Sequence, residues 1–361
     1  MKDKYKMEGH KLLWHLDRVN QWKEGKLIAP IHIDVGLSKG CNIKCEYCYG
    51  VTQGNLYAGG AKTYFPKEAL LRYMRDAGKA GVRSMAFIGE GEPLMNPHLY
   101  EAISEGSNAG VDISLGTNGT IFNTGEKGFR ALKDLTWLRF NLSAASKEAY
   151  KRVHGSPLFD KLLKNIRFCV EQKQKHDLLI TIGLQMVLTP SNVDQVVDLS
   201  KLGKELGVDY LVVKQCSDTQ NNDIGVYKQL DKYIDFSDKL KEAEEVSCDG
   251  YNVIVKWNKI QNQGVRHYDQ CLAPPFLLYS SGDGRLYPCG MFFDIDEEKY
   301  RMGDLTKQSF TDIINSNRYR EVIDLVSQID VHKKCYSNCR SHWINDFLNT
   351  VNSPPEHVNF I

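Results

Sequence analysis

The chain has 361 residues, of which 42% are hydrophobic and 25% are charged, so it can form one large domain and a smaller one and is neither disordered nor collagen-like. Lys and Arg number 46 against 45 Asp and Glu, a balance that disfavours binding to nucleic acid or to an anionic membrane. The first residues are polar and charged, and no run of about 18 apolar residues occurs. We therefore expect a cytoplasmic protein without a membrane or nucleic-acid partner.

A cysteine motif follows the first predicted strand, at residues 31–36. Cys41, Cys45 and Cys48 are spaced C-x3-C-x2-C on the loop after that strand, and in a reducing cytosol such clusters are more often metal ligands than disulfides. Three thiolates can hold a [4Fe-4S] cluster and leave one iron open for a substrate or cofactor. The alternative is a zinc knuckle, completed by a distant fourth cysteine or by a histidine such as His32.

This motif, with the aromatic Tyr47 just before its last cysteine, resembles the hallmark of the radical S-adenosylmethionine (SAM) superfamily. The resemblance implies that Cys41, Cys45 and Cys48 bind a [4Fe-4S] cluster whose open iron takes SAM. It also implies that the backbone around Tyr47 faces the adenine of SAM.

A second motif follows the helix predicted at residues 66–80 and the strand predicted at 84–88. Residues 89–93 read Gly-Glu-Gly-Glu-Pro, which is similar to the Gly-Gly-Glu-Pro motif that receives the amino group of SAM in this superfamily. Glu90 interrupts the glycine pair, and Glu92 is the better candidate to accept a hydrogen bond from the ammonium. The resemblance therefore assigns four residues to SAM binding, which are Gly89, Glu90, Gly91 and Glu92.

The strands and helices continue to alternate along the chain. Further strands are predicted at residues 111–115, 137–143, 179–187 and 209–214, and helices at 147–153, 159–172 and 193–206. Such alternation implies parallel strands joined by right-handed crossovers. The chain is therefore expected to be α/β, and the resemblance implies a partial (β/α)6 barrel over residues 31–245. Ligands of such barrels bind at the C-terminal strand ends, where Cys41, Cys45, Cys48, Glu92, Asn118, Ser143 and Lys214 all lie.

By resemblance, further residues should contact SAM. Asn118 and Ser143 should reach the ribose or the carboxylate, and Gln185 could touch the same ligand. Many relatives carry an arginine just before the glycine that follows the next helix, and His154 occupies that position here. Arg152 lies two residues earlier, so either side chain could pair with the SAM carboxylate.

Four more cysteines lie near the C-terminus. Cys271 and Cys289 are separated by 17 residues around a predicted hairpin, and Cys335 and Cys339 form C-x3-C after a helix predicted at residues 311–326. Spacing alone does not distinguish zinc from an iron-sulfur cluster. The order of these features resembles the twitch or shortened SPASM extension of radical SAM enzymes. It implies one auxiliary [4Fe-4S] cluster in a small α+β domain. Full ligation of that cluster requires both Cys335 and Cys339 to reach it, and this is the interpretation we favour.

Four segments are therefore expected. Residues 1–30 form an N-terminal helical extension, 31–245 the barrel, 246–345 the auxiliary-cluster domain and 346–361 a C-terminal tail.

The resemblance implies an enzyme that forms a 5′-deoxyadenosyl radical and removes a hydrogen atom from its substrate. We expect a dehydrogenase-type oxidoreductase that acts on a sugar, an aminocyclitol or a similar small polar metabolite. An electron donor such as flavodoxin or ferredoxin would reduce the first cluster, and the auxiliary cluster would accept an electron from the substrate radical. The candidates for proton transfer are Lys214, Asp218 and Arg285.

Alternative functions remain open. One is a maturase of a ribosomally made peptide, although only about 30 residues precede the first predicted strand, fewer than the peptide-binding domain that such maturases commonly carry. Another is an epimerase of a carbohydrate. A third, from a different class, is a non-catalytic zinc or iron-sulfur protein.

Overall fold

The computed structural model describes residues 9–48, 63–216, 232–293 and 295–360. Within these residues the larger sheet has ten strands in the order β12-β11-β10-β1-β4-β5-β6-β7-β8-β9, and β2 and β3 form a separate ribbon. The strands are β1 (His32–Val35), β2 (Ser38–Lys39), β3 (Thr63–Tyr64), β4 (Ser84–Phe87), β5 (Asp112–Thr117), β6 (Leu135–Asn141), β7 (Thr181–Leu188), β8 (Tyr210–Gln215), β9 (Asn252–Val255), β10 (Leu277–Ser280), β11 (Arg285–Tyr287) and β12 (Gly303–Asp304).

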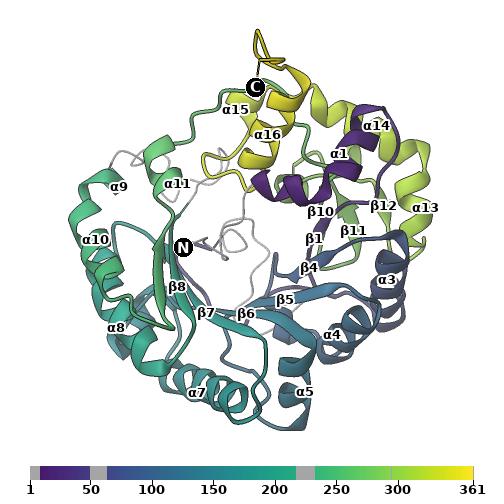
Figure 1. The fold of residues 1–361 in the computed structure, drawn as a ribbon. Helices are drawn as coiled ribbons and strands as arrows, with labels where there is room; N and C mark the ends of the chain where they lie inside the picture. The colour runs from purple at the N-terminus through teal and green to yellow at the C-terminus, as the bar shows by residue number, and fades with distance from the viewer. Residues whose placement is uncertain (1–8, 49–62, 217–231, 294, 361) are drawn as a thin grey trace.

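The sheet curves around the centre of the molecule, and the helices surround it (Figure 1). Strands β1 and β4 to β9 are parallel, as alternating strands and helices predict. The predicted hairpin is also present, and its first strand, β10, joins the sheet parallel to β1. The expected α/β fold, a partial barrel extended by a small C-terminal unit, is confirmed.

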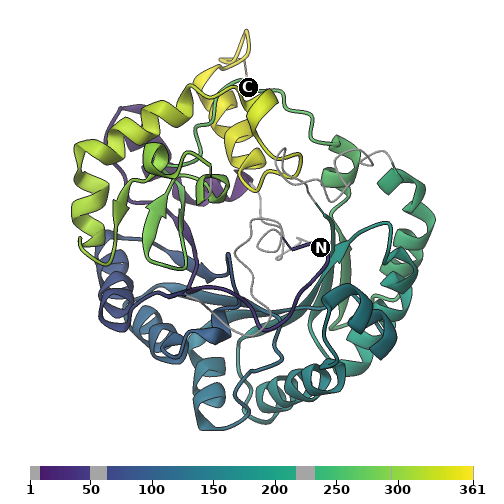
Figure 2. The same cartoon turned by 180° about the vertical axis from the view of Figure 1, so that it is seen from behind.

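The helical elements are short and mostly lie between consecutive strands. They are η1 (Gly9–His15), α1 (Leu16–Lys23), α3 (Lys67–Ala80), η2 (Pro93–Met95), α4 (Leu99–Asn108), α5 (Glu126–Asp134), α6 (Lys147–His154), α7 (Phe159–Lys175), η3 (Val193–Gln195), α8 (Val196–Leu206), α9 (Lys232–Asp235), α10 (Ser237–Glu245), α11 (Trp257–Asn262), η5 (Gly290–Phe293), α12 (Glu297–Tyr300), α13 (Phe310–Asn315), α14 (Asn317–Ser327), α15 (Val331–Lys334) and α16 (His342–Asn352). Figure 2 shows from behind that the C-terminal hairpin and its helices lie at one edge of the curved sheet.

The single helix predicted at residues 311–326 is wrong. The chain forms α13 and α14 there, because Ser316 has an extended backbone, with φ −75° and ψ 157°. Its hydroxyl accepts a hydrogen bond from the backbone N–H of Tyr319 at 3.1 Å. Serine is a favoured N-cap, so a new helix begins at this point.

Side chains alternate between the two faces of the barrel strands, as strand geometry requires. On β1, Ile33 and Val35 are buried in the hydrophobic core beneath the helices, so His32 and Asp34 lie on the opposite, concave face. The same alternation places Arg139 of β6 on the concave face. Apolar residues therefore hold the helices to the sheet, and the concave face carries polar side chains.

Two of the expected segment boundaries fall within continuous structure. Beyond residue 245, β9 still continues the barrel sheet by pairing with β8, and the boundary at 345 and 346 lies inside α16. The N-terminal helices pack on α16 through Leu12, Val19 and Leu348, which are buried together, and α1 and α16 are close in Figure 1. The division into four segments stays a prediction. None of the helices in the described residues is long and apolar enough to cross a membrane.

Candidate active site

The first three cysteines lie on the loop after β2, where their thiols influence one another. Burial, and then Glu92 and Cys48, raise the pKa of Cys41 to about 12. Burial, and then Cys48 and Cys41, raise the pKa of Cys45 well above its usual value. Buried thiolates that repel one another need compensating positive charge, which bound iron supplies. The chemistry of this donor set therefore fits an iron-sulfur cluster.

This cysteine loop rests on the C-terminal end of α6. The backbone N–H of Lys44 donates to the carbonyl of His154 at 3.1 Å, and that of Glu46 donates to the carbonyl of Val153 at 2.9 Å. The next residue, Gly155, has a φ of +60°, and a Cβ atom there would lie 2.6 Å from the carbonyl oxygen of Lys44. Only glycine allows this approach, so the end of α6 fixes the position of the loop.

His154 is fully buried between this loop and β6. Its Nε2 accepts a hydrogen bond from the backbone N–H of Ser143 at 2.9 Å, and its Nδ1 lies 3.1 Å from the sulfur of Cys45. Because burial lowers the pKa of His154 to about 3, the ring is neutral. Its one proton is therefore on Nδ1 and is donated to the sulfur of Cys45.

Arg152, the alternative to His154, contacts the segment that follows β7. Its guanidinium is half exposed, lies 3.8 Å from Asp194 and donates to the carbonyl of Ser191 at 3.4 Å. The pairing of either Arg152 or His154 with the SAM carboxylate stays a prediction.

Tyr47 and Ser143 lie together beyond the end of β6, and Gln185 lies on the neighbouring strand, β7. The Tyr47 hydroxyl and Ser143 Oγ are 3.0 Å apart, and Ser143 Oγ also accepts the backbone N–H of Val187 at 3.0 Å. Gln185 Nε2 donates to Asn141 Oδ1 at 3.1 Å. Ser143 thus joins Tyr47 of the cysteine loop to β7, while its contact with SAM stays a prediction.

Asn118 lies directly against the cysteine loop. Its side-chain Nδ2 is 3.5 Å from the sulfur of Cys41 and donates to Asn42 Oδ1 at 2.9 Å. Cys41 therefore has a side-chain N–H donor in Asn118, as Cys45 has one in His154. The sequence placed Asn118 at this rim without indicating the contact with Cys41.

Glu92 is 3% exposed and fastens its loop to the end of β5. Its carboxylate accepts the hydroxyl of Thr117, the backbone N–H of Asn118 at 2.8 Å and that of Leu94 at 3.1 Å. Burial raises the pKa of Glu92 even though these bonds oppose the rise. A carboxylate has about four acceptor positions, and the described residues use three of them. The contact of Glu92 with the SAM ammonium stays a prediction.

Glu90 points to the C-terminal hairpin. Its Oε2 accepts the backbone N–H of Gly282, in the hairpin turn, at 2.6 Å. Lys39 Nζ lies 3.6 Å from Glu90 Oε1 and 3.0 Å from Asp283 Oδ2. The glutamate that interrupts the glycine pair therefore joins the predicted SAM-binding loop to the auxiliary unit, and its contact with SAM stays a prediction.

The two glycines of that motif meet other backbones closely. A Cβ atom on Gly91 would lie 2.1 Å from the carbonyl oxygen of Gly40, and Gly89 has a φ of +148°. Neither position accepts a side chain, which places this loop directly against the cysteine loop.

The four C-terminal cysteines lie on three segments, and their thiols influence one another. Cys271 precedes β10, Cys289 follows β11, and Cys335 and Cys339 lie between α15 and α16. Burial, and then Cys339 and Cys335, raise the pKa of Cys271 to about 12, and Cys339 and Cys271 act in the same way on Cys289. This set also fits an iron-sulfur cluster, since four mutually repelling thiolates need compensating positive charge.

The thiols of neither set are gathered around one point. In the part of the chain that the structure describes, no three His, Cys, Asp or Glu side chains form a group that could hold a metal ion. In an iron-sulfur cluster each thiolate binds its own iron.

A polar network on the concave face was not predicted. Arg340, which follows Cys339, places Nε 2.8 Å from Asp34 Oδ2 and Nη2 2.9 Å from His32 Nε2. Burial would raise the pKa of Asp34, but Arg340 and His32 outweigh it and lower that pKa. The sequence feature that could have indicated this network is the alternation of polar His32 and Asp34 with apolar residues on the first strand. This network joins the auxiliary cysteine loop to β1.

The structure separates the residues proposed for proton transfer. Lys214 lies on β8, and burial, followed by the charges of Arg139, Lys259 and Arg340, lowers its pKa to about 7.

Arg285 lies on the C-terminal hairpin, paired with Glu297 and 3.7 Å from Asp283. Burial would lower the pKa of Arg285, but these two carboxylates raise it, which makes this side chain a poor proton acceptor. Asp218 lies outside the described residues.

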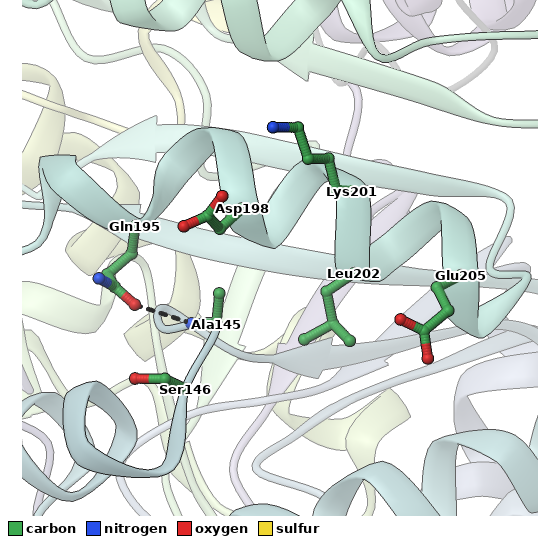
Figure 3. A pocket seen from close by; sticks show the side chains of 7 residues that line it. All are labelled: Ala145, Ser146, Gln195, Asp198, Lys201, Leu202 and Glu205. Atoms are coloured by element: carbon green, nitrogen blue, oxygen red, sulfur yellow. Dashed lines mark hydrogen bonds between the residues drawn. The ribbon is translucent and has the colours of Figure 1, made fainter.

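A pocket on the outside of the barrel lies apart from these groups. It is formed by α8 and the segment before α6, where Gln195 Oε1 accepts the backbone N–H of Ala145 at 3.2 Å (Figure 3). None of the cysteines or predicted SAM-site residues lines it.

Comparisons with known proteins agree with this arrangement. Residues 35–203 match the family model of the Radical SAM superfamily, and residues 271–341 match that of an iron-sulfur cluster-binding domain.

Two curated proteins are similar over most of their length. The tungsten-containing aldehyde ferredoxin oxidoreductase cofactor-modifying protein of Pyrococcus furiosus is 24% identical over 77% of this chain and 79% of its own. The AdoMet-dependent heme synthase of Methanosarcina barkeri is 22% identical over 87% of this chain and 92% of its own.

Among solved structures, Streptococcus suis SuiB bound to its precursor peptide SuiA shares the fold, with a TM-score of 0.63 and 14% identity over 96% of this chain and 78% of SuiB. The two matched domains imply three kinds of cofactor, which are SAM, the [4Fe-4S] cluster that binds SAM, and an auxiliary iron-sulfur cluster held by the C-terminal domain. The chain is a member of the radical SAM superfamily with a C-terminal auxiliary-cluster domain of the SPASM or twitch kind.

Proposed function

We propose that this enzyme is a dehydrogenase-type radical SAM oxidoreductase that acts on a small polar metabolite, with a sugar or an aminocyclitol as the first candidates. The observation that supports it best is that four buried cysteine thiols near β10, the strand that pairs with β1, act on one another electrostatically. Four thiolates ligate every iron of a [4Fe-4S] cluster, which leaves no iron for substrate and favours electron transfer.

When bound, the cofactors supply a 5′-deoxyadenosyl radical that takes one hydrogen atom from a carbinol carbon and an auxiliary cluster that accepts one electron. One proton remains to be removed from the hydroxyl group to complete a ketone. We assign this proton to Lys214. A lysine whose pKa lies at about 7 is partly unprotonated at neutral pH and can act as a base.

The remaining residues position these groups. His154 and Asn118 direct N–H donors at two cysteines, and Glu92 fastens the loop that is predicted to receive the SAM amino group. The concave face, where Lys214 lies, is proposed to hold the substrate, since the strand ends of such barrels collect ligands.

The similar curated proteins support a small organic molecule over a peptide as substrate. Their names describe cofactor modification and heme synthesis, whereas the peptide-bound SuiB structure shows the fold alone. We further propose a flavodoxin or ferredoxin as electron donor and a cytoplasmic location, because clustered cysteines that ligate clusters are typical of a reducing compartment.

The test is anaerobic reconstitution followed by reaction with SAM, dithionite and a panel of sugars and aminocyclitols. We expect about eight irons per chain, release of 5′-deoxyadenosine, and a product two hydrogens lighter than one substrate of the panel. No 5′-deoxyadenosine would contradict the radical chemistry. An isomer of unchanged mass would indicate epimerisation, and modification only of an added precursor peptide would indicate a maturase.

A further inference from the structure

Four cationic side chains gather on the concave face of the barrel. Arg139 extends from β6, Lys214 from β8, Lys259 from α11, and Arg340 from the loop that carries Cys339. Each is half-buried and so keeps surface that a ligand can contact. Their charges act on one another, because Arg139, Lys259 and Arg340 all oppose protonation of Lys214.

Among the described residues, carboxylates balance only part of this charge. Within the described residues, Asp34 is the one carboxylate paired with any of the four, through its contact of 2.8 Å with Arg340. No ion pair in the described part of the chain involves Arg139, Lys214 or Lys259. Cys339 offsets part of this charge, because it opposes the lowering of the pKa of Lys259. Clustered cations whose counter-charges are incomplete destabilise a buried site, and an anion bound among them would reduce that cost.

Arg139 shows how its site is built. Its cross-strand neighbours are Gly116 on β5 and Gly183 on β7, so no side chain opposes it on either adjacent strand. A Cβ atom on Gly116 would lie 3.2 Å from Arg139 Nη2. The guanidinium lies over the ring of Trp137 at 4.7 Å, and its buried Nε has no hydrogen-bond partner among the described residues. An aromatic ring therefore positions this cation and leaves a donor unused.

We propose that Arg139, Lys259 and Arg340 bind an anionic substituent of the substrate, a phosphate or a carboxylate. Guanidinium and ammonium groups bind both through charge-assisted hydrogen bonds. The inference rests on the proposed function and narrows it, because these cations attract an acidic or phosphorylated sugar and repel the ammonium of an aminocyclitol. The bound anion lies beside Lys214, so it orients the neighbouring carbinol carbon toward the proposed base.

The test is calorimetric titration of the anaerobically reconstituted holoenzyme with four probes, which are inorganic phosphate, glutarate, myo-inositol and streptamine. We expect phosphate or glutarate to bind and the neutral and cationic probes not to bind. Tighter binding of phosphate assigns a phosphate ester, and tighter binding of glutarate assigns a carboxylate. Absence of binding by both anions, or equal binding of streptamine, overturns the inference.

Variants connect binding to these residues. Lys259→Met and Arg139→Gln should each weaken anion binding by about tenfold or more, the effect of losing one charge-assisted hydrogen bond. The controls Lys204→Met and Arg130→Gln, at exposed positions, should bind as the parent does. Unchanged binding in Lys259→Met overturns the inference even if Arg139→Gln fails to fold. Holoenzyme that releases 5′-deoxyadenosine but binds no anion refutes this inference and leaves the proposed function standing.

Discussion

His154 donates a hydrogen bond from Nδ1 to the sulfur of Cys45, 3.1 Å away. The backbone N–H of Ser143 donates to the other ring nitrogen at 2.9 Å, which fixes the tautomer. Hydrogen bonds to the sulfurs of an iron-sulfur cluster raise its reduction potential, because they stabilise the more negative reduced state. His154 therefore both supports the cysteine loop and affects how readily the cluster is reduced.

Replacing His154 by Leu should lower the reduction potential of the SAM-binding cluster, since the donor to Cys45 is lost. The potential is measured by anaerobic titration with EPR detection, on a variant whose iron content equals that of the parent. His176→Leu, at an exposed position at the end of α7, is the control. A potential equal to that of the parent would show that the contact is structural only.

The two cysteine sets should have separable roles. Cys45→Ala should abolish reductive cleavage of SAM, whereas Cys289→Ala should retain uncoupled cleavage and lose product, because its auxiliary cluster can no longer accept the electron. Chromatography of 5′-deoxyadenosine and of product measures both, with the exposed Cys248 replaced by Ala as control. Normal product from Cys289→Ala would refute the electron-acceptor role.

The hairpin turn at Gly282 should tolerate no side chain. A Cβ atom there would lie 2.4 Å from the carbonyl carbon and oxygen of Ser38, so Gly282→Ala should force the turn away from β2 and break the bond that Glu90 accepts. We expect a loss of about 1–3 kcal/mol in the free energy of unfolding, as for other overpacked sites. The control is Gly290→Ala, whose Cβ atom would meet its nearest neighbour at 3.6 Å. Equal melting temperatures of the two variants would contradict this prediction.

Product formation should depend on the protonation of Lys214. Burial and then Arg139 lower its pKa to about 7 in the enzyme without substrate. Because the base must be unprotonated, kcat/KM should rise with pH around that value and level off above it. Lys214→Met should form product slowly with no such rise, and Lys204→Met should keep the parent profile. The measurement is initial product rate from about pH 6 to 9, with substrate-free SAM cleavage followed in parallel. A parent profile retained in Lys214→Met would exclude Lys214 as the base.

Local patterns in the sequence were enough for most of the barrel strands and for the cysteine motif. Alternating strands and helices predicted the parallel sheet, and the spacing of Cys41, Cys45 and Cys48 predicted one loop, because such patterns depend on residues close together in the chain. The break between α13 and α14 at Ser316 is also local. Serine is a favoured N-cap and could have indicated it, but the continuous helical periodicity favoured a single helix.

The partners of Glu90, His154 and Arg340 were decided by the tertiary structure. Glu90 contacts Gly282 because β10 pairs with β1, a neighbour relation between segments far apart in the chain that no local periodicity contains. His154 contacts Cys45 because the end of α6 supports the cysteine loop. Strand order and helix packing determine which side chains far apart in the chain come into contact. The sequence by itself determined only the local elements and motifs that carry those side chains.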